Sequence, residues 1–196
     1  SSLLATVINN SVVCPQGAGN GVVAIVGAGS RDTEVINNTV SGCQNGVLAM
    51  GWSGGSDAGR INGVIANNLL SVQNAGLEFH SEHTPALPNN FNLINAASAA
   101  NVPIGPQTLL APARLVSTTV PRLRADSPAI DAASPAIVGG SLTTYELPAV
   151  DVDGLRRTKG AAPDIGAYEY GDAGFRHVAT AAGISGHIDH FDHPLA

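Results

Sequence analysis

The stretch "VINNSVV" at Val7–Val13 occurs twice more, as "VINNTVS" at Val35–Ser41 and as "IANNLLS" at Ile65–Ser71. Each copy places two asparagines between short runs of β-forming residues. The second asparagines of the three copies are 28 and 30 residues apart: Asn10, Asn38 and Asn68. A fourth pair, Asn89-Asn90 in "NNFNLIN", follows 22 residues later. Such even spacing indicates a stacked repeat.

A second motif recurs out of phase with the first: "NGVVAI" from Asn20, "NGVLAM" from Asn45 and "NAGLEF" from Asn74. Two strand-like runs therefore recur in each period of about 22–30 residues, flanked by Gly, Asn or Ser. Leucine-rich repeats share this period, but they need a fixed leucine frame that this chain lacks. Parallel strands joined by short turns build a right-handed parallel β-helix. We therefore predict an all-β solenoid of this type.

The asparagines have a structural interpretation in such a solenoid. An amide carries both a donor and an acceptor, so Asn10, Asn38 and Asn68 can form a column of hydrogen bonds along the axis. Asparagine also tolerates the left-handed backbone that sharp corners between strands require. Binding of sugars by the rows of asparagine is the alternative.

The two cysteines, Cys14 and Cys43, lie 29 residues apart, close to one period. Equivalent positions of neighbouring coils are about 4.8 Å apart, which is within reach of a disulfide. A bridge and a pair of buried free thiols both fit this spacing. In either case the pair is structural.

Composition excludes several classes of function. The net charge of −6 and the single lysine, Lys159, argue against a nucleic-acid partner, since phosphates need clustered Lys and Arg. No stretch is apolar over the length of a membrane span.

The chain starts without a Met or a signal peptide, and we expect it to be a piece of a longer, secreted or cell-surface protein of bacterial type.

Three motifs follow one another in the second half of the chain: "LRADSPAIDAAS" at Leu123–Ser134, "DVDGLRR" at Asp151–Arg157 and "PDIGAYEY" at Pro163–Tyr170. They resemble the C-terminal part of choice-of-anchor Q domain proteins, although Ala133 stands where that family usually has Gly. The resemblance covers about a quarter of the chain. It implies a secreted or surface β-helix of pectin-lyase-like fold and no defined catalytic activity.

The same motifs predict an irregular cap over the last coil, because open strand edges invite association. Several aspartates are expected to hold this cap by pairing with Arg124, Arg156 and Arg157 or by accepting hydrogen bonds from backbone amides. They are Asp126, Asp131, Asp151, Asp153 and Asp164. Asp151 and Asp153 in "DVDG" could also begin a calcium loop, although the full loop pattern is absent. Calcium is therefore a possible cofactor, and a salt-bridged turn is the alternative. The predicted units are coils at 1–100, a last coil and cap at 101–170, and a linker and tail at 171–196.

The tail is rich in histidine. His187, His190 and His193 are spaced for one face of a helix and could bind a metal, although Gly186 and Pro194 disfavour a helix there. The alternative is an extended segment that starts a further domain or packs on a neighbouring subunit.

The strongest candidate for an active site is "LEFHSEH", in which Glu78, His80 and His83 could act as acid and base or bind a metal. A polar outer face is the alternative, because the coils lack the repeated acidic positions of a hydrolase. We therefore expect a non-catalytic structural or adhesive module that could assemble with itself, end to end, into a filament or sheath. The competing functions are a polysaccharide lyase and a carbohydrate-binding module, both of which would have a polysaccharide as partner.

Overall fold

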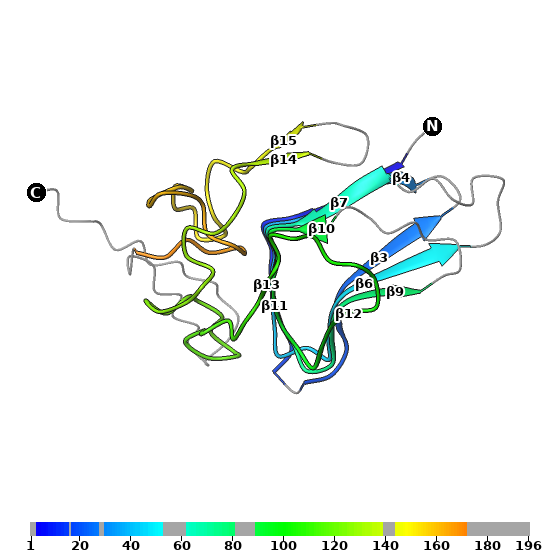
Figure 1. Cartoon of the computed structure of the whole chain (residues 1–196), viewed down its shortest axis with the longest axis horizontal. Helices are drawn as coiled ribbons and strands as arrows, with labels where there is room; N and C mark the ends of the chain where they lie inside the picture. The colour runs from blue at the N-terminus through cyan, green and yellow to red at the C-terminus, as the bar shows by residue number, and fades with distance from the viewer. Residues whose placement is uncertain are drawn as a thin grey trace, which may run out of the picture.

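The computed structural model describes residues 3–15, 17–27, 30–52, 62–80, 89–138 and 144–171, and every regular element in these ranges is a β-strand. Each copy of the repeat contributes one strand to each of three parallel sheets, which Figure 1 shows along the direction in which the repeats stack. The prediction of an all-β fold built from parallel strands is confirmed.

The strands have the following bounds. Sheet A contains, in spatial order, β1 (Leu3–Ile8), β4 (Ser30–Ile36), β7 (Asn62–Ala66) and β10 (Asn89–Asn90). Sheet B contains β2 (Ser11–Val13), β5 (Thr39–Ser41), β8 (Leu69–Ser71), β11 (Leu93–Asn95) and β13 (Leu109–Leu110). Sheet C contains β3 (Asn20–Gly27), β6 (Asn45–Trp52), β9 (Ala75–His80) and β12 (Ser98–Ala100). A separate antiparallel pair is formed by β14 (Ala136–Val138) and β15 (Thr144–Glu146).

The core between the three sheets is made of columns of like side chains. In sheet A, Val7 pairs with Val35 and Val35 with Ile65, and the other sheets repeat this pattern. The remaining members of the columns are Val12, Val40, Leu70 and Ile94 in sheet B and Val22, Val47 and Leu77 in sheet C. Alternate residues of a strand share one face, so this core is the apolar face of the repeat.

The second asparagine of each pair forms a continuous ladder inside the corner between sheets A and B. The side-chain amide of Asn10 donates to Oδ1 of Asn38 over 3.1 Å, and that of Asn38 donates to Oδ1 of Asn68 over 3.0 Å. Asn68 in turn donates to Oδ1 of Asn92, also over 3.0 Å. The predicted column of Asn10, Asn38 and Asn68 is confirmed.

The fourth member of the ladder differs from the sequence-based prediction. Asn92, rather than Asn90, follows Asn68, because Leu93 pairs with Leu69 in sheet B. The corner before it is occupied by Phe91, whose φ of 53° is left-handed. The prediction from "NN" was wrong there because the register follows the strand after the corner, not the letters of the pair.

The first asparagine of each pair takes the left-handed backbone, with φ of 60°, 53° and 56° at Asn9, Asn37 and Asn67. Its side chain binds the part of the chain that follows β13. Asn37 Nδ2 donates to the carbonyl of Gly166 over 3.3 Å, and Asn67 exchanges two hydrogen bonds of 2.9 Å with the backbone of Ser134. The two asparagines of each pair therefore have separate roles: the second forms the ladder, and the first binds a second layer of the chain.

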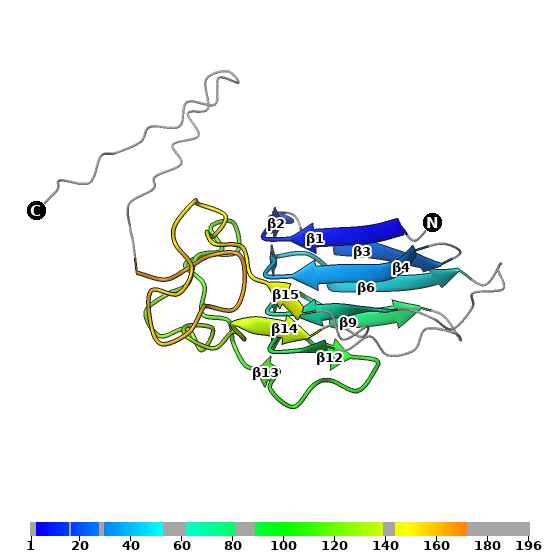
Figure 2. The ribbon, with the colours of Figure 1, turned by 90° about the horizontal axis from the view of Figure 1, so that it is seen from above.

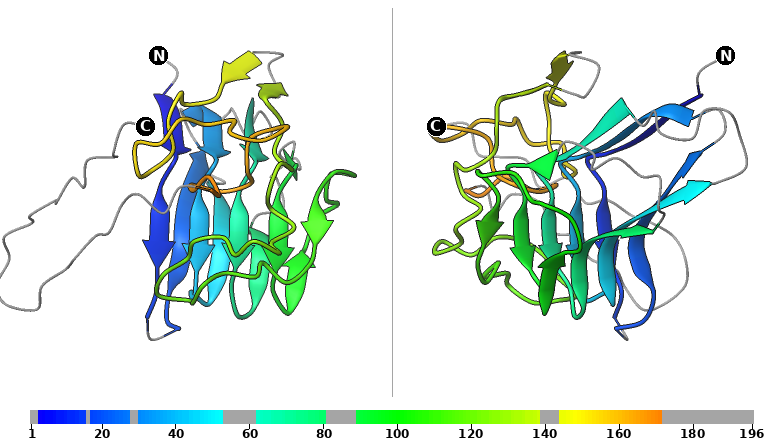
Figure 3. Two further views of the ribbon diagram at one scale, coloured as in Figure 1. Left: turned by 90° about the vertical axis from the view of Figure 1, so that its left-hand side faces the viewer. Right: turned by 45° about the vertical axis from the view of Figure 1, so that its right-hand side comes forward.

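We call that second layer, residues 111–138 and 144–171, the flanking segment. It lies along the outside of sheets A and B, where its hydrogen bonds reach three successive repeats, at Asn9, Asn37 and Asn67 (Figures 2 and 3). The prediction of a lid over the last coil is therefore wrong in position. The segment is irregular, as expected, but it braces the side of the sheets.

Sheet B explains this position because β8 and β11 are apolar on both faces. Leu69, Leu93 and Leu109 pair with one another on the outer face and pack against the flanking segment. That segment contributes Ala113, Leu115, Leu123, Ala129, Ile130, Ala133 and Ile165. Strands that are buried on both faces carry consecutive apolar residues, as β8 does at Leu69 and Leu70.

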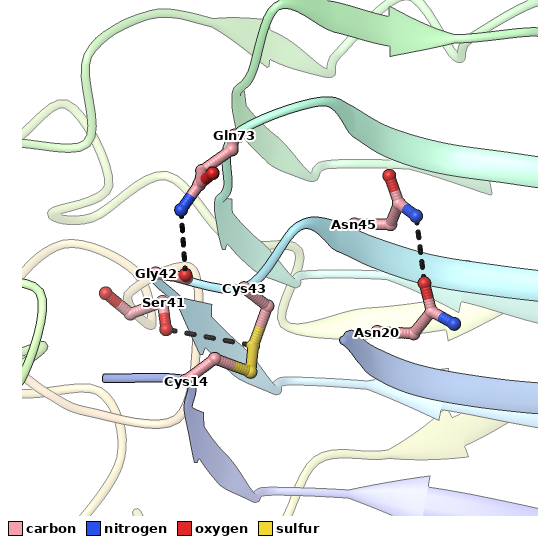
Figure 4. Close-up of a disulfide and its surroundings, with 7 residues drawn as sticks. All are labelled: Cys14, Asn20, Ser41, Gly42, Cys43, Asn45 and Gln73. Atoms are coloured by element: carbon pink, nitrogen blue, oxygen red, sulfur yellow. Dashed lines mark hydrogen bonds between the residues drawn. A yellow bond between two sulfur atoms is a disulfide. The ribbon is translucent and has the colours of Figure 1, made fainter. Parts of the chain in front are cut away.

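The cysteines form a disulfide between the first and second repeats (Figure 4). Their separation of 29 residues exceeds the 28 between the ladder asparagines because Gly42 is inserted before Cys43. Cys43 is fully buried in the core and Cys14 packs against it. Of the two interpretations of the sequence, the structure has the bridge.

Replacing both cysteines with alanine is expected to lower the free energy of unfolding by about 2–4 kcal/mol, because the bridge closes a loop of intermediate length in the unfolded chain. Urea unfolding of the variant and of the oxidised parent measures the difference. The parent under reducing conditions is the control, and it should fall to the level of the variant. Equal stability of oxidised parent and variant would contradict this role.

Candidate functional site

The described surface has a groove of about 560 Å³ on sheet C and the turns that lead into it. Its polar lining comes from three successive repeats. Gln44 and Asn45 belong to the second repeat, Asn74 and Glu78 to the third, and Ser98 and Asn101 to the fourth. The groove therefore runs along the direction in which the repeats stack.

Stacking of the repeats sets the positions of these side chains. Asn45 donates to Oδ1 of Asn20 over 2.8 Å (Figure 4). Its own Oδ1 accepts the backbone N–H of Ala75 over 3.3 Å. Asn101 forms two hydrogen bonds of 2.9 Å with the backbone of Phe79. The amides that border the groove are thus held by the same coil-to-coil pairing as the ladder.

Glycine allows the close approach of the repeats beneath the groove. Gly46 and Gly76 follow the first position of β6 and β9, and a Cβ on Gly46 would lie 2.4 Å from the carbonyl oxygen of Gly76. The second repeat motif is aligned by these glycines, so Asn45 pairs with Ala75 rather than with Asn74. Asn74 instead lies in the turn, where it is exposed.

Of the three predicted catalytic candidates, Glu78 is the one whose side chain the structure describes. Glu78 is partly buried and lines the groove. His80 ends β9, but its side chain is outside the described part of the structure, and so is the whole of His83. Among the residues that line the groove, Glu78 supplies the single carboxyl group. Amides and hydroxyls can exchange hydrogen bonds with neutral hydroxyl groups, whereas glycoside hydrolysis generally uses two carboxyl groups.

Among the described residues, a strongly buried group of charges lies in the flanking segment. Arg157 and Glu169 form an ion pair of 3.1 Å, and their side chains are only 3% and 1% exposed. Arg157 also donates to the carbonyls of Gly166 and Ala167 and to Oδ1 of Asn9. This arginine thus joins the flanking segment to the first repeat.

The neighbouring Arg156 was predicted for this role together with Arg157. Arg156 is exposed and makes an antiparallel bridge to Val150 through its backbone. Because successive side chains of an extended segment point to opposite sides, Arg157 is the one that points inward. The structure thus gives this role to Arg157, the last residue of "DVDGLRR", and not to Arg156.

The two predicted structural aspartates hold the end of the flanking segment. Asp164 accepts the backbone N–H of Asp131 over 2.8 Å and that of Tyr170 over 2.6 Å. Asp131 accepts the backbone N–H of Ala162 over 3.2 Å. Both residues therefore bind backbone amides, as the sequence predicts.

The "DVDG" turn has the contacts of the salt-bridged alternative. Asp151 accepts the backbone N–H groups of Asp153, Leu155 and Glu169, over 2.9, 2.8 and 3.0 Å. Asp153 is bound by both terminal nitrogens of Arg122. Both carboxylates on which the calcium prediction rests thus have protein partners.

Burial changes the pKa values of this cluster. Desolvation raises the pKa of Asp164 and of Glu169 above their ordinary values. The nearby Asp131 adds to the rise in the pKa of Asp164, and Asp164 adds to the rise in the pKa of Glu169. Desolvation also lowers the pKa of Arg157, against the opposing effect of the nearby Glu169. All three shifts have burial as their largest cause.

A carboxyl group with a raised pKa binds its proton more tightly in the folded state than in the unfolded state. Its contribution to stability is therefore largest below the ordinary pKa, and it is lost as the pH rises through the raised value. We expect the stability of the native chain relative to Glu169→Gln to increase as the pH falls toward 4.5, the ordinary pKa of Glu. Urea unfolding of both proteins across that range measures the difference. A relative stability that decreases on acidification would contradict the shift.

Within the described ranges, no three His, Cys, Asp or Glu side chains come together as metal ligands. The predicted tail ligands His187, His190 and His193 lie outside those ranges. In the same part of the chain, no helix has the length and apolar character needed to cross a membrane. Comparison with models of protein families, with curated proteins and with solved structures finds no match.

Proposed function

We propose that the chain is part of a right-handed parallel β-helix that acts as a non-catalytic structural and adhesive module of a secreted or cell-surface protein. The observation that carries this proposal is the brace on the side of the sheets. Asn9, Asn37 and Asn67 tie one segment to three successive repeats, so the repeats cannot shift or separate without breaking it. Right-handed winding is the general rule for parallel connections.

The residues that resemble choice-of-anchor Q domain proteins favour a mechanical role. Ser127, Asp131, Asp151, Arg157, Asp164 and Glu169 all form hydrogen bonds or ion pairs within the chain. The polar groups of these residues are used in hydrogen bonds within the chain, so they position the backbone and have few groups left to bind a substrate. Membership of that family is part of the proposal.

The disulfide supports an extracellular location. Bridges of this kind persist in oxidising compartments and are rare in the reducing cytosol. Cys14–Cys43 joins the first two repeats, and so reinforces the end of the stack that the flanking segment reaches through Asn9.

Contact with a polysaccharide is a second candidate function, and the groove on sheet C favours it. Its amides and its serine repeat with the stacking of the coils, which suits a chain of sugars lying along the axis. The single acidic residue of the lining, Glu78, favours binding without cleavage. A lyase remains the competing proposal, with Glu78, His80 and His83 as its candidate residues.

One experiment separates these functions. The full chain is incubated with neutral and uronic-acid polysaccharides, and both retention in affinity electrophoresis and release of unsaturated products are measured. A binding module retains the chain in at least one gel without product, and Asn74→Ala should weaken retention about tenfold through lost hydrogen bonds. Ser117→Ala, which changes an exposed residue of the flanking segment, is the matched control. Product formation that Glu78→Gln abolishes would instead establish a lyase, and absence of both signals would leave the structural role alone.

A further inference from the structure

The three sheets end very differently at their two edges. At the N-terminal edge stand β1, β2 and β3, with 6, 3 and 8 residues, and none of these residues is charged or a proline. Each of these strands pairs on one side only among the described residues (Figure 2). Proteins usually protect edge strands with charges, prolines or short length, because such edges add further strands readily.

The C-terminal edge has those protections. There β10 has two residues, β13 two and β12 three. The stretch that continues past β12 contains Pro103 and Pro106, which have no N–H to donate to another strand. The contrast indicates that the N-terminal edge, and not the other, is built to pair.

The core is also incomplete at the N-terminal edge. Val35 and Val40 of the second repeat are 0% exposed. Val7 and Val12, which lie directly above them in the same columns, are only partly buried. One more layer of apolar side chains would complete their burial, as each repeat does for its neighbour.

The asparagine ladder shows what this layer must contain. Each ladder asparagine donates its backbone N–H and its side-chain N–H to Oδ1 of the next one, as Asn38 does to Asn68 over 3.0 Å in both bonds. Asn10 gives the same two bonds to Asn38. Its own Oδ1 receives no bond from the described residues, so the ladder begins with an exposed acceptor that can take the same two donors.

We infer that the N-terminal edge is a docking surface for a polypeptide segment of the same strand–Asn-Asn–strand type, lying parallel to β1 and β2. Its second asparagine would donate its backbone N–H and its side-chain N–H to Oδ1 of Asn10. Its inward apolar residues would cover Val7 and Val12. The inference concerns a different surface from the groove and stands without the proposed binding of polysaccharide.

The polarity of the ladder argues against a second copy as the occupant. Two copies related by a two-fold axis would bring two Asn10 side chains together, yet the amide of Asn10 already donates to Ile8 and Asn38. In a head-to-tail stack the C-terminal edge would offer Thr108, which is equivalent to Asn92. The backbone N–H of Thr108 is bonded to the carbonyl of Gly105, and its side chain offers a buried hydroxyl, not an amide.

The test uses the full chain and a labelled synthetic peptide that copies residues 30–43 with Cys43→Ser. The matched control peptide also carries Asn38→Ala, which removes the ladder amide and keeps the corner asparagine. Fluorescence anisotropy should show about tenfold tighter binding of the first peptide, because the control peptide keeps the backbone N–H but lacks the side-chain amide that donates to Oδ1 of Asn10. The preference should disappear with Asn10→Ala in the chain, and hydrogen exchange should show protection of β1 and β2 by the first peptide.

Four results would overturn the inference. They are no binding at millimolar peptide, equal binding of both peptides, a preference that survives Asn10→Ala, or protection of other strands. Light scattering adds a fifth outcome: a dimer of the chain that excludes the peptide would assign the edge to a second copy instead. Thermal unfolding of Asn10→Ala shows that the variant is folded, and Thr118→Ala at an exposed position is the control for mutation itself.

Discussion

Replacing Arg157 with alanine is expected to lower the free energy of unfolding by about 3–5 kcal/mol, as for other buried ion pairs that lose one partner. The change leaves the carboxyl group of Glu169 buried beside Asp164, with no cation to balance it. It also removes the donors to Asn9, Gly166 and Ala167, which connect the flanking segment to the repeats. Urea unfolding followed by circular dichroism measures the loss.

The neighbouring residue supplies the control. Arg156 has the same chemistry but an exposed side chain, so Arg156→Ala should change stability by no more than about 0.5 kcal/mol. Arg157→Lys should recover only part of the loss, because an ammonium cannot reach the separate acceptors of a guanidinium. Similar effects of Arg156→Ala and Arg157→Ala would show that the buried pair does not hold the flanking segment.

The repeat made most of the fold predictable. A column of asparagines needs equivalent positions in successive strands, and the spacing of Asn10, Asn38 and Asn68 provides them. The same spacing brought Cys14 and Cys43 within range of each other, although it could not distinguish a bridge from two thiols. Backbone periodicity is encoded locally, which is why these features can be read from the sequence.

Where the repeat becomes irregular, the prediction failed in register. The fourth corner has Phe91 in the left-handed position that asparagine fills elsewhere. The strand after the corner, "NLIN", matches "NLLS" and carries the correct alignment to Asn92. The decisive signal was the apolar pair that follows the ladder asparagine, because the sheet pairs through that strand.

The position of the flanking segment depended on tertiary contacts. Leu69 and Leu70 face opposite sides of β8, one outward to the flanking segment and one inward to the core. That both faces are apolar predicts a covering layer, but it does not say which segment supplies it. The groove was likewise only half predicted: Glu78 was found from its neighbours, whereas Gln44, Ser98 and Asn101 come together only when the repeats stack.

The ladder itself provides the second large effect. Asn68 is fully buried, and its amide donates to the carbonyls of Val35 and Ala66 and to Oδ1 of Asn92. Its own Oδ1 accepts the backbone and side-chain N–H groups of Asn38. Asn68→Ala leaves several of these groups without partners in a site that has no access to water. Since each unsatisfied buried group costs about 1–3 kcal/mol, we expect a total loss of about 3–5 kcal/mol in the free energy of unfolding.

The position of each asparagine in the ladder makes this prediction specific. Asn10 is the equivalent asparagine in the first repeat, but it is exposed at the edge of the sheets, where water can replace a lost hydrogen bond. Asn10→Ala should therefore cost only about 1 kcal/mol. Asn68→Asp should be nearly as damaging as Asn68→Ala, because a carboxylate cannot donate to the carbonyls of Val35 and Ala66 and would be buried without a cation. Urea unfolding of the three variants orders them, and equal losses at Asn10 and Asn68 would mean that the ladder adds no stability beyond its individual corners.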